Sequence, residues 1–205
     1  TLTKNKLSFG NIISFEDKYY EYNQEDQNDY FGEAFQQEAL KDRVTLEDFY
    51  TQLYTEYSNN ILGNIKFHVA YNNFNYGYDK VTYINNTLIT NRLLGDVYSI
   101  GGAYSKTINR FSLEGNFGLN VSGDFEGNYI SGQAAYQFTK DIAFGAKISH
   151  NSKAPNYNYL LYQSVYENYN WQTNFNNIET QNIELALKSK KLANVSVDVT
   201  SINDY

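Results

Sequence analysis

The chain has 205 residues, with 21 Tyr and 13 Phe but no Cys, no Met and a single Pro. Its formal net charge of -7 argues against a nucleic-acid-binding protein, because phosphate binding needs clustered Lys and Arg side chains. No stretch approaches the roughly 18 consecutive apolar residues that a membrane-spanning helix needs, so any membrane-spanning segment has to be a strand.

In chain order, the sequence predicts about nine strands, in which apolar and polar side chains alternate. An early strand near residues 51–57 alternates only weakly. A helix over residues 46–57 is the alternative there, because Phe49, Leu53 and Tyr57 lie at i, i+4 spacing. The later expected strands are residues 65–72, 98–105, 111–121, 130–138, 142–149, 183–188 and 195–200.

The clearest strand runs from Phe111 to Val121, where apolar residues such as Leu113 alternate with polar ones such as Ser112 and Glu114. Ten steps of about 3.3 Å, tilted by about 40°, project to roughly 25 Å, the height of the apolar band on an outer-membrane barrel. A strand of this length spans a membrane once. The period of two predicts that one side of it meets lipid and the other meets the barrel lumen.

The same alternation divides the strand residues into two sets. The residues expected to face the lumen and to line a pore are Lys66, His68, Ser112, Glu114, Asn116, Asn120, Gln133, Gln137, Lys147, Glu184, Lys188 and Asp198. The residues expected to face lipid are Phe67, Val69, Ile100, Phe111, Leu113, Phe117, Leu119, Ile130, Tyr136, Phe144, Ile148, Ile183, Leu185, Leu187, Val195 and Val197. Basic and acidic side chains are balanced in the first set, so no strong ion selectivity is expected.

The lengths of the expected connections alternate along the chain. Long loops are expected near residues 23–44, 77–92, 123–128 and 152–178. Short turns are expected near residues 59–63, 107–110, 139–141 and 190–193. Outer-membrane barrels combine long extracellular loops with short periplasmic turns in this way, whereas a Greek-key sandwich does not. The sequence therefore predicts an all-β fold, in which residues 1–205 form part of a single transmembrane, antiparallel, up-and-down β-barrel domain.

An odd number of strands is unusual for a bacterial barrel, because an open sheet edge leaves backbone groups unpaired in lipid. The simpler expectation is that the chain is a fragment of a longer barrel. The alternative is a free strand edge that pairs with the barrel assembly machinery or with another outer-membrane protein. The other expected partners are outer-membrane lipid and lipopolysaccharide, and no nucleic acid is expected.

Aromatic residues gather where the expected strands meet the long loops, among them Tyr76, Tyr78, Tyr162 and Tyr166. Rings with a polar tip favour the membrane interface, so this placement predicts an aromatic girdle. For any single Tyr, packing within a loop is the alternative.

Catalysis is not expected from this sequence. The two histidines, His68 and His150, fall on opposite sides of the expected strands and have no identifiable catalytic partner. Acidic residues near 25–29 and 124–126 could bind Ca²⁺ or bridge to lipopolysaccharide, but they lack the ligand spacing of a calcium loop. Solvated loop charge is the favoured interpretation, so the sequence predicts no metal site and no cofactor.

Four segments resemble the putative porins of Bacteroidetes: Asn28–Ala34, Ser122–Tyr129, His150–Asn158 and Leu160–Gln172. The resemblance extends over essentially the whole chain. It implies an outer-membrane barrel and passive diffusion, and it carries no catalytic or binding residues to transfer. Members of that family are longer than this chain, which also predicts a fragment.

The leading functional hypothesis is a porin-like barrel of the bacterial outer membrane that allows passive diffusion of small solutes. One alternative is a non-transporting surface or structural barrel, or a barrel client bound to assembly or secretion machinery. Another is the barrel part of an energy-coupled nutrient transporter, which requires a plug domain upstream.

Overall fold

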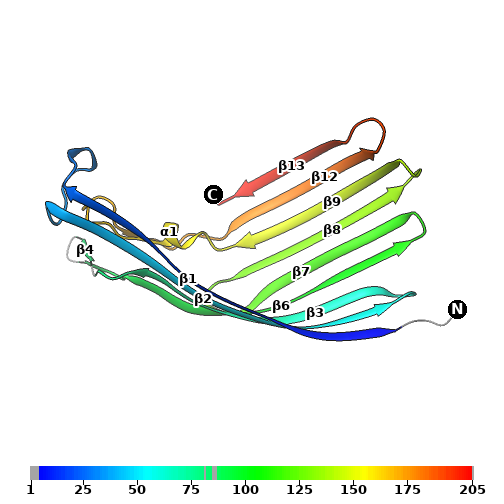
Figure 1. Ribbon diagram of the computed structural model, residues 1–205, viewed down its shortest axis with the longest axis horizontal. Helices are drawn as coiled ribbons and strands as arrows, with labels where there is room; N and C mark the ends of the chain where they lie inside the picture. The colour runs from blue at the N-terminus through cyan, green and yellow to red at the C-terminus, as the bar shows by residue number, and fades with distance from the viewer. Residues whose placement is uncertain (1–4, 81, 85–86, 205) are drawn as a thin grey trace.

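Most of the chain forms one antiparallel sheet of nine strands in the order β1-β2-β3-β6-β7-β8-β9-β12-β13 (Figure 1). The computed structural model describes residues 5–80, 82–84 and 87–204. The strands of the sheet are β1 (Lys6–Asp26), β2 (Glu38–Asn59), β3 (Gly63–Tyr78), β6 (Arg92–Ile108), β7 (Phe111–Gly123), β8 (Gly127–Gln137), β9 (Ile142–Lys153), β12 (Ile178–Ser189) and β13 (Val195–Asn203). Each strand pairs with its neighbour in this order, so the predicted all-β, up-and-down arrangement is confirmed.

The remaining elements are small and belong to the loops. They are the 3-10 helix η1 (Asp29–Phe31), the hairpin of β4 (Thr82–Ile84) with β5 (Thr87–Ile89), the helix α1 (Tyr157–Leu160), and the hairpin of β10 (Leu161–Tyr162) with β11 (Trp171–Gln172). Among the described residues, no helix is long and apolar enough to cross a membrane. The helix considered over residues 46–57 is wrong, because β2 pairs along this stretch with both β1 and β3.

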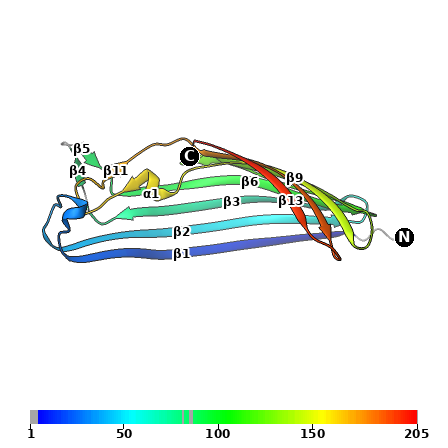
Figure 2. The same ribbon diagram turned by 90° about the horizontal axis from the view of Figure 1, so that it is seen from above.

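The long connections after β1, β3 and β9 lie together at one end of the sheet and the short turns lie at the other end, on the side of the N-terminus (Figures 1 and 2). The connection after β7 is only residues 124–126, so it is shorter than the long loop expected near 123–128. The first loop is shorter than the expected 23–44, because β1 and β2 stay paired out to Asp26 and Glu38. Their outer side chains are polar and charged, and the ion pair between Lys41 and Glu21 (2.9 Å) lies there. In β1 and β2 the alternation of apolar and polar side chains therefore ends several residues before the backbone pairing does.

The strand register keeps residues of one kind on one side of the sheet. Val69 pairs with Ile100, and Ile100 pairs with Leu119, so these apolar residues share one side. Lys147 pairs with Gln133 on β8 and with Glu184 on β12. We call the side that carries Val69 the apolar face and the side that carries Lys147 the polar face.

The apolar face is exposed. Fifteen of the sixteen side chains expected to face lipid have exposed fractions between 40% and 64%, and Ile100 is half-buried. Phe117, Phe144 and Leu185 are all exposed and do not converge into a closed core. A closed core formed by these three residues would have contradicted a membrane protein. A water-soluble monomer rarely exposes an apolar patch that extends over so many strands.

Two glycines let aromatic rings lie flat on the polar face. A Cβ at Gly118 would lie 2.2 Å from the Tyr129 ring, and one at Gly101 would lie 2.5 Å from the His68 ring. Only glycine leaves room for such a ring across the neighbouring strand. The ring faces are thereby presented to the space above the polar face.

Candidate functional site

The loop between β9 and β12, residues 154–177, folds over the polar face at the end of the sheet where the long loops lie (Figure 2). Leu161 is completely buried in this loop, where it packs against Tyr76 and Tyr78 of β3. Both tyrosines alternate in step with His68 and therefore lie on the polar face. The loop thus covers the side of the sheet on which a lumen is expected.

A second contact joins loop 154–177 to β2 and to the first long loop. Leu40, Val165 and Tyr166 form a buried cluster, against which Phe31 packs. Burying apolar side chains of this size stabilises an interaction by about 1.5–3 kcal/mol each. Loop 154–177 is therefore a packed element and not a free solvent loop.

Hydrogen bonds fix the position of the same loop. The Asp42 carboxylate accepts from Ser164 Oγ (2.9 Å) and from the backbone N–H of Val165 (2.9 Å), and it forms an ion pair with Lys80 (3.7 Å). Gln163 Nε2 donates to the carbonyl of Thr90 at 3.0 Å. Because Asp42 is only slightly exposed, its two accepted hydrogen bonds are of the stronger, charge-assisted kind.

Backbone and phenol contacts extend these connections to the first loop. The Phe35 N–H donates to the carbonyl of Val165 (2.9 Å), and the Glu167 N–H donates to the carbonyl of Glu33 (3.0 Å). The Tyr166 hydroxyl donates to Gln24 Oε1 at 3.0 Å. Contacts from β1, the first loop, β2, β3 and Thr90 thus hold loop 154–177 against the sheet.

Stacked rings run along the contact between this loop and β3. Tyr157 stacks on Tyr76 and on Phe74, with ring centroids 5.2 Å apart in both pairs. Phe74 also stacks on Phe125 at 5.0 Å. Burial in this stack raises the pKa of the Tyr157 phenol to about 12. We call Phe74, Tyr76, Phe125 and Tyr157 the aromatic array.

The predicted aromatic girdle is wrong for the residues buried in these contacts. Tyr76, Tyr78 and Tyr166 are buried, and Tyr162 stacks on Trp171 with ring centroids 4.6 Å apart. These rings pack between loop and sheet because the alternation of β3 turns Tyr76 and Tyr78 away from the apolar face. Packing within a loop, the alternative interpretation, is correct for them.

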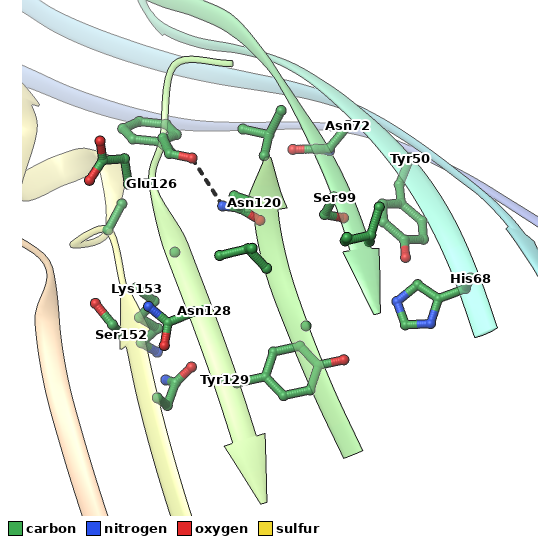
Figure 3. Close-up of a pocket in the computed structure, with 18 of the residues that line it drawn as sticks. Tyr50, His68, Asn72, Ser99, Asn120, Glu126, Asn128, Tyr129, Ser152 and Lys153 are labelled. Atoms are coloured by element: carbon green, nitrogen blue, oxygen red, sulfur yellow. Dashed lines mark hydrogen bonds between the residues drawn. The ribbon is translucent and has the colours of Figure 1, made fainter. Parts of the chain in front are cut away.

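A hollow of about 510 Å³ opens on the polar face beside the aromatic array (Figure 3). Tyr50, His68 and Tyr129 contribute rings to it, and Asn72 and Asn120 contribute amides. Asn72 Nδ2 donates to Asp48 Oδ1 at 2.9 Å, and Asn120 Nδ2 donates to the carbonyl of Phe125 at 3.0 Å. We call this space the central hollow, and its lining also includes the charged residues Asp48, Glu126 and Lys153.

Charged side chains of the polar face gather closer to the short turns. A hollow of about 370 Å³ there is lined by Glu56, Lys66, Glu114 and Lys147. Lys66 Nζ lies 4.1 Å from the centroid of the Tyr54 ring. Within the part of the chain that the structure describes, these four side chains form no ion pair with one another. Charges of both signs therefore line this hollow without neutralising one another in ion pairs.

The register places all twelve residues expected to face a lumen on the polar face, and all sixteen expected to face lipid on the apolar face. Contact of these faces with water and with lipid stays a prediction. Sequence reasoning missed Tyr50, Glu56 and Tyr129, which lie on the polar face as well. Their odd or even position in the strand could have identified them, because Glu56 pairs with Lys66 and Tyr129 pairs with Gly118, and both partners lie on the polar face.

The two histidines lie on opposite faces. His68 lies beside Gly101 on the polar face, whereas His150 pairs with Ile130 and lies on the apolar face. They cannot act together on one substrate. Within the described residues, no group of three or more His, Cys, Asp or Glu side chains is arranged to hold a metal ion.

Comparison with known protein families gives a match that covers the whole chain. A family model described as putative porin matches residues 1–205. The chain belongs to this family. No curated protein and no solved structure matches it. The resemblance noted in the loop segments is confirmed by the family match, and this putative porin is a porin-like outer-membrane protein.

Proposed function

We propose that this putative porin allows small solutes to diffuse passively along the polar face, through a passage that loop 154–177 narrows. One observation carries the proposal: the apolar side chains of this loop, Leu161 above all, are buried against the polar face. A loop that packs on this side takes up cross-section on the side of the expected lumen. An extracellular loop packed on the outer rim would leave the lumen unchanged.

The polar face supplies two successive environments for a solute. Beneath the loop the central hollow presents amides and phenols, such as Asn72 and Tyr129. Closer to the short turns, acidic and basic side chains such as Glu114 and Lys147 line the path. Polar and charged linings of this kind keep a passage hydrated and set its ion preference.

The apolar face supports a location in the lipid of the outer membrane, with lipopolysaccharide next to the long loops. Exposed side chains such as Phe117 and Ile130 would gain from transfer into hydrocarbon, at about 25 cal/mol per Å² of apolar area. The long loops would lie outside the cell and the short turns in the periplasm. We expect no catalytic role, because the family to which the chain belongs is described as putative porin.

The two edges of the sheet favour a second proposal about partners. β1 and β13 each pair on one side only, and every residue of β13 is exposed. In lipid, unpaired backbone groups on such an edge cost several kcal/mol each. We propose that further strands pair here, either from the same barrel or from the barrel assembly machinery. Cross-linking from cysteines introduced on β1 and β13 would identify the strand that pairs with each edge.

Conductance measurements test the channel proposal. The protein, expressed from its complete gene and folded in detergent, is added to planar lipid bilayers in KCl. We expect discrete conductance steps, and the same protein after heat unfolding is the control. Folded protein that inserts into the bilayer without producing conductance steps would remove the channel function.

A further inference from the structure

A second space lies beside loop 154–177, further toward the long loops than the central hollow. It has a volume of about 290 Å³, and Tyr20, Tyr22, Phe31, Tyr162 and Tyr169 are among the aromatic residues that line it. We call this space the mouth pocket. Its lining comes from β1, β2, β3 and two loops, so it exists only because loop 154–177 is folded inward.

Aromatic rings connect the mouth pocket to the central hollow. Tyr78, which lines the mouth pocket, lies 6.2 Å from Tyr76, and Tyr76 lies 5.2 Å from Tyr157. Tyr157 in turn lies 6.0 Å from Phe125, which lines the central hollow. Each distance joins two ring centroids. The rings therefore form a continuous series on the polar face, from one space to the other.

The polar groups beside these rings are mainly neutral. The mouth pocket has no Lys or Arg in its lining, and its one carboxylate, Asp42, already accepts hydrogen bonds from Ser164 and Val165. The central hollow adds amides and phenols such as Asn120 and Tyr129. A ligand for such a site needs flat apolar faces to stack on rings and hydroxyl groups to bond with amides.

Pyranose sugars have both properties, since their axial C–H groups form apolar faces and their rims carry hydroxyls. We propose that the mouth pocket and the central hollow bind neutral saccharides, at two sites between which the packed rings of the aromatic array form the wall. This inference rests on the proposed channel function and adds a solute class to it. An organic cation is the competing ligand, because aromatic rings and the carboxylates of Asp48 and Glu126 attract cations, whereas Lys153 repels them. Choline is therefore included among the probes.

Tyr20 and Tyr19 provide a matched pair of variants. The two residues are neighbours on β1 with similar exposed fractions of 69% and 66%, and Tyr20 pairs with Val44, whereas Tyr19 pairs with Thr45. Tyr20 therefore lies on the polar face and lines the mouth pocket, and Tyr19 lies on the opposite face. Neither residue belongs to the two buried clusters that hold loop 154–177, so we expect the loop to stay docked when either is replaced by Ala.

Calorimetric titration of the folded protein in detergent measures binding without relying on conductance. The probes are neutral hexasaccharides of glucose, mannose and galactose, together with choline chloride and a polyethylene glycol of similar size. We expect at least one hexasaccharide to bind, and Tyr20→Ala to weaken its binding by about two- to tenfold. Tyr19→Ala should leave the affinity unchanged.

The outcomes separate this inference from the channel proposal. Saccharide binding without conductance would support the two saccharide sites and overturn the channel. Conductance without binding of any hexasaccharide would overturn the saccharide inference alone. Stronger binding of choline, or equal effects of the Tyr20 and Tyr19 variants, would also overturn it.

Discussion

Shortening Leu161 tests whether loop 154–177 is held by packing against the polar face. The Leu161 side chain is 0% exposed and contacts Tyr76 and Tyr78. Replacing a buried leucine with alanine costs about 2–5 kcal/mol. Because β3 is held independently by β2 and β6, this loss should fall on the docking of the loop and not on the sheet. A loss of this size raises the population of undocked loop by roughly 30-fold to 4,000-fold.

Hydrogen exchange measured by mass spectrometry reads this population directly. The N–H groups of Val165 and Glu167 are protected by bonds to Asp42 and to the carbonyl of Glu33. In Leu161→Ala we expect their exchange to accelerate within the range given above, while amides in β8 and β9 stay protected. Single-channel conductance should rise at the same time, because an undocked loop no longer occupies the passage.

The matched control is Leu185→Ala. This leucine lies on β12 with an exposed fraction of 48%, on the apolar face and away from the loop. The Leu185→Ala variant removes the same side-chain atoms as Leu161→Ala but leaves the contact of loop 154–177 with Tyr76 and Tyr78 unchanged. The reasoning is refuted if Leu161→Ala leaves loop exchange unchanged, or if both variants accelerate exchange throughout the sheet.

Three further predictions concern the loop and the two faces. Asp42→Ala removes the acceptor for Ser164 and Val165, so loop docking should weaken by about 1.5–3 kcal/mol per charged hydrogen bond, measured as larger conductance fluctuations. Burial raises the pKa of Tyr157 to about 12. The stability that the buried, neutral phenol contributes to the folded protein is therefore complete below about pH 10 and is lost as the pH rises through 12. Near-ultraviolet circular dichroism should show this transition in the native protein and not in Tyr157→Phe. Phe117→Arg on the apolar face should cost about 2–4 kcal/mol in liposome unfolding experiments, whereas Asn116→Arg on the polar face should be tolerated.

The two faces of the sheet could be predicted from the sequence because apolar and polar residues alternate within each strand. In β7, Leu113 and Asn116 differ by an odd number of positions, and this parity alone puts them on opposite sides. Pairing with β8 then carries the assignment to the next strand without further information. Short turns, which the sequence also shows, then identify the strand pairs β2–β3, β6–β7, β8–β9 and β12–β13 as neighbours.

The fold of loop 154–177 could not be predicted in the same way. Its packing joins Leu161 to Tyr78 and Val165 to Leu40, which are separated by more than 80 positions in the chain, and no periodicity links such segments. Short apolar runs such as Leu160–Leu161 are ambiguous between strand, helix and loop core. Only a contact between distant parts of the chain decides which of these forms.

The tyrosines of β3 nevertheless contained a usable signal. Tyr76 and Tyr78 occupy even positions, as do His68 and Ala70, so alternation assigns them to the polar face. An aromatic girdle requires rings on the lipid side, which parity excludes for these two residues. Large apolar rings on a polar face need a cover, and the longest loop of the chain is the segment with enough apolar side chains to provide it. Where alternation and aromatic clustering disagree, alternation is the stronger guide, because it is fixed by backbone geometry, whereas clustering reflects only composition.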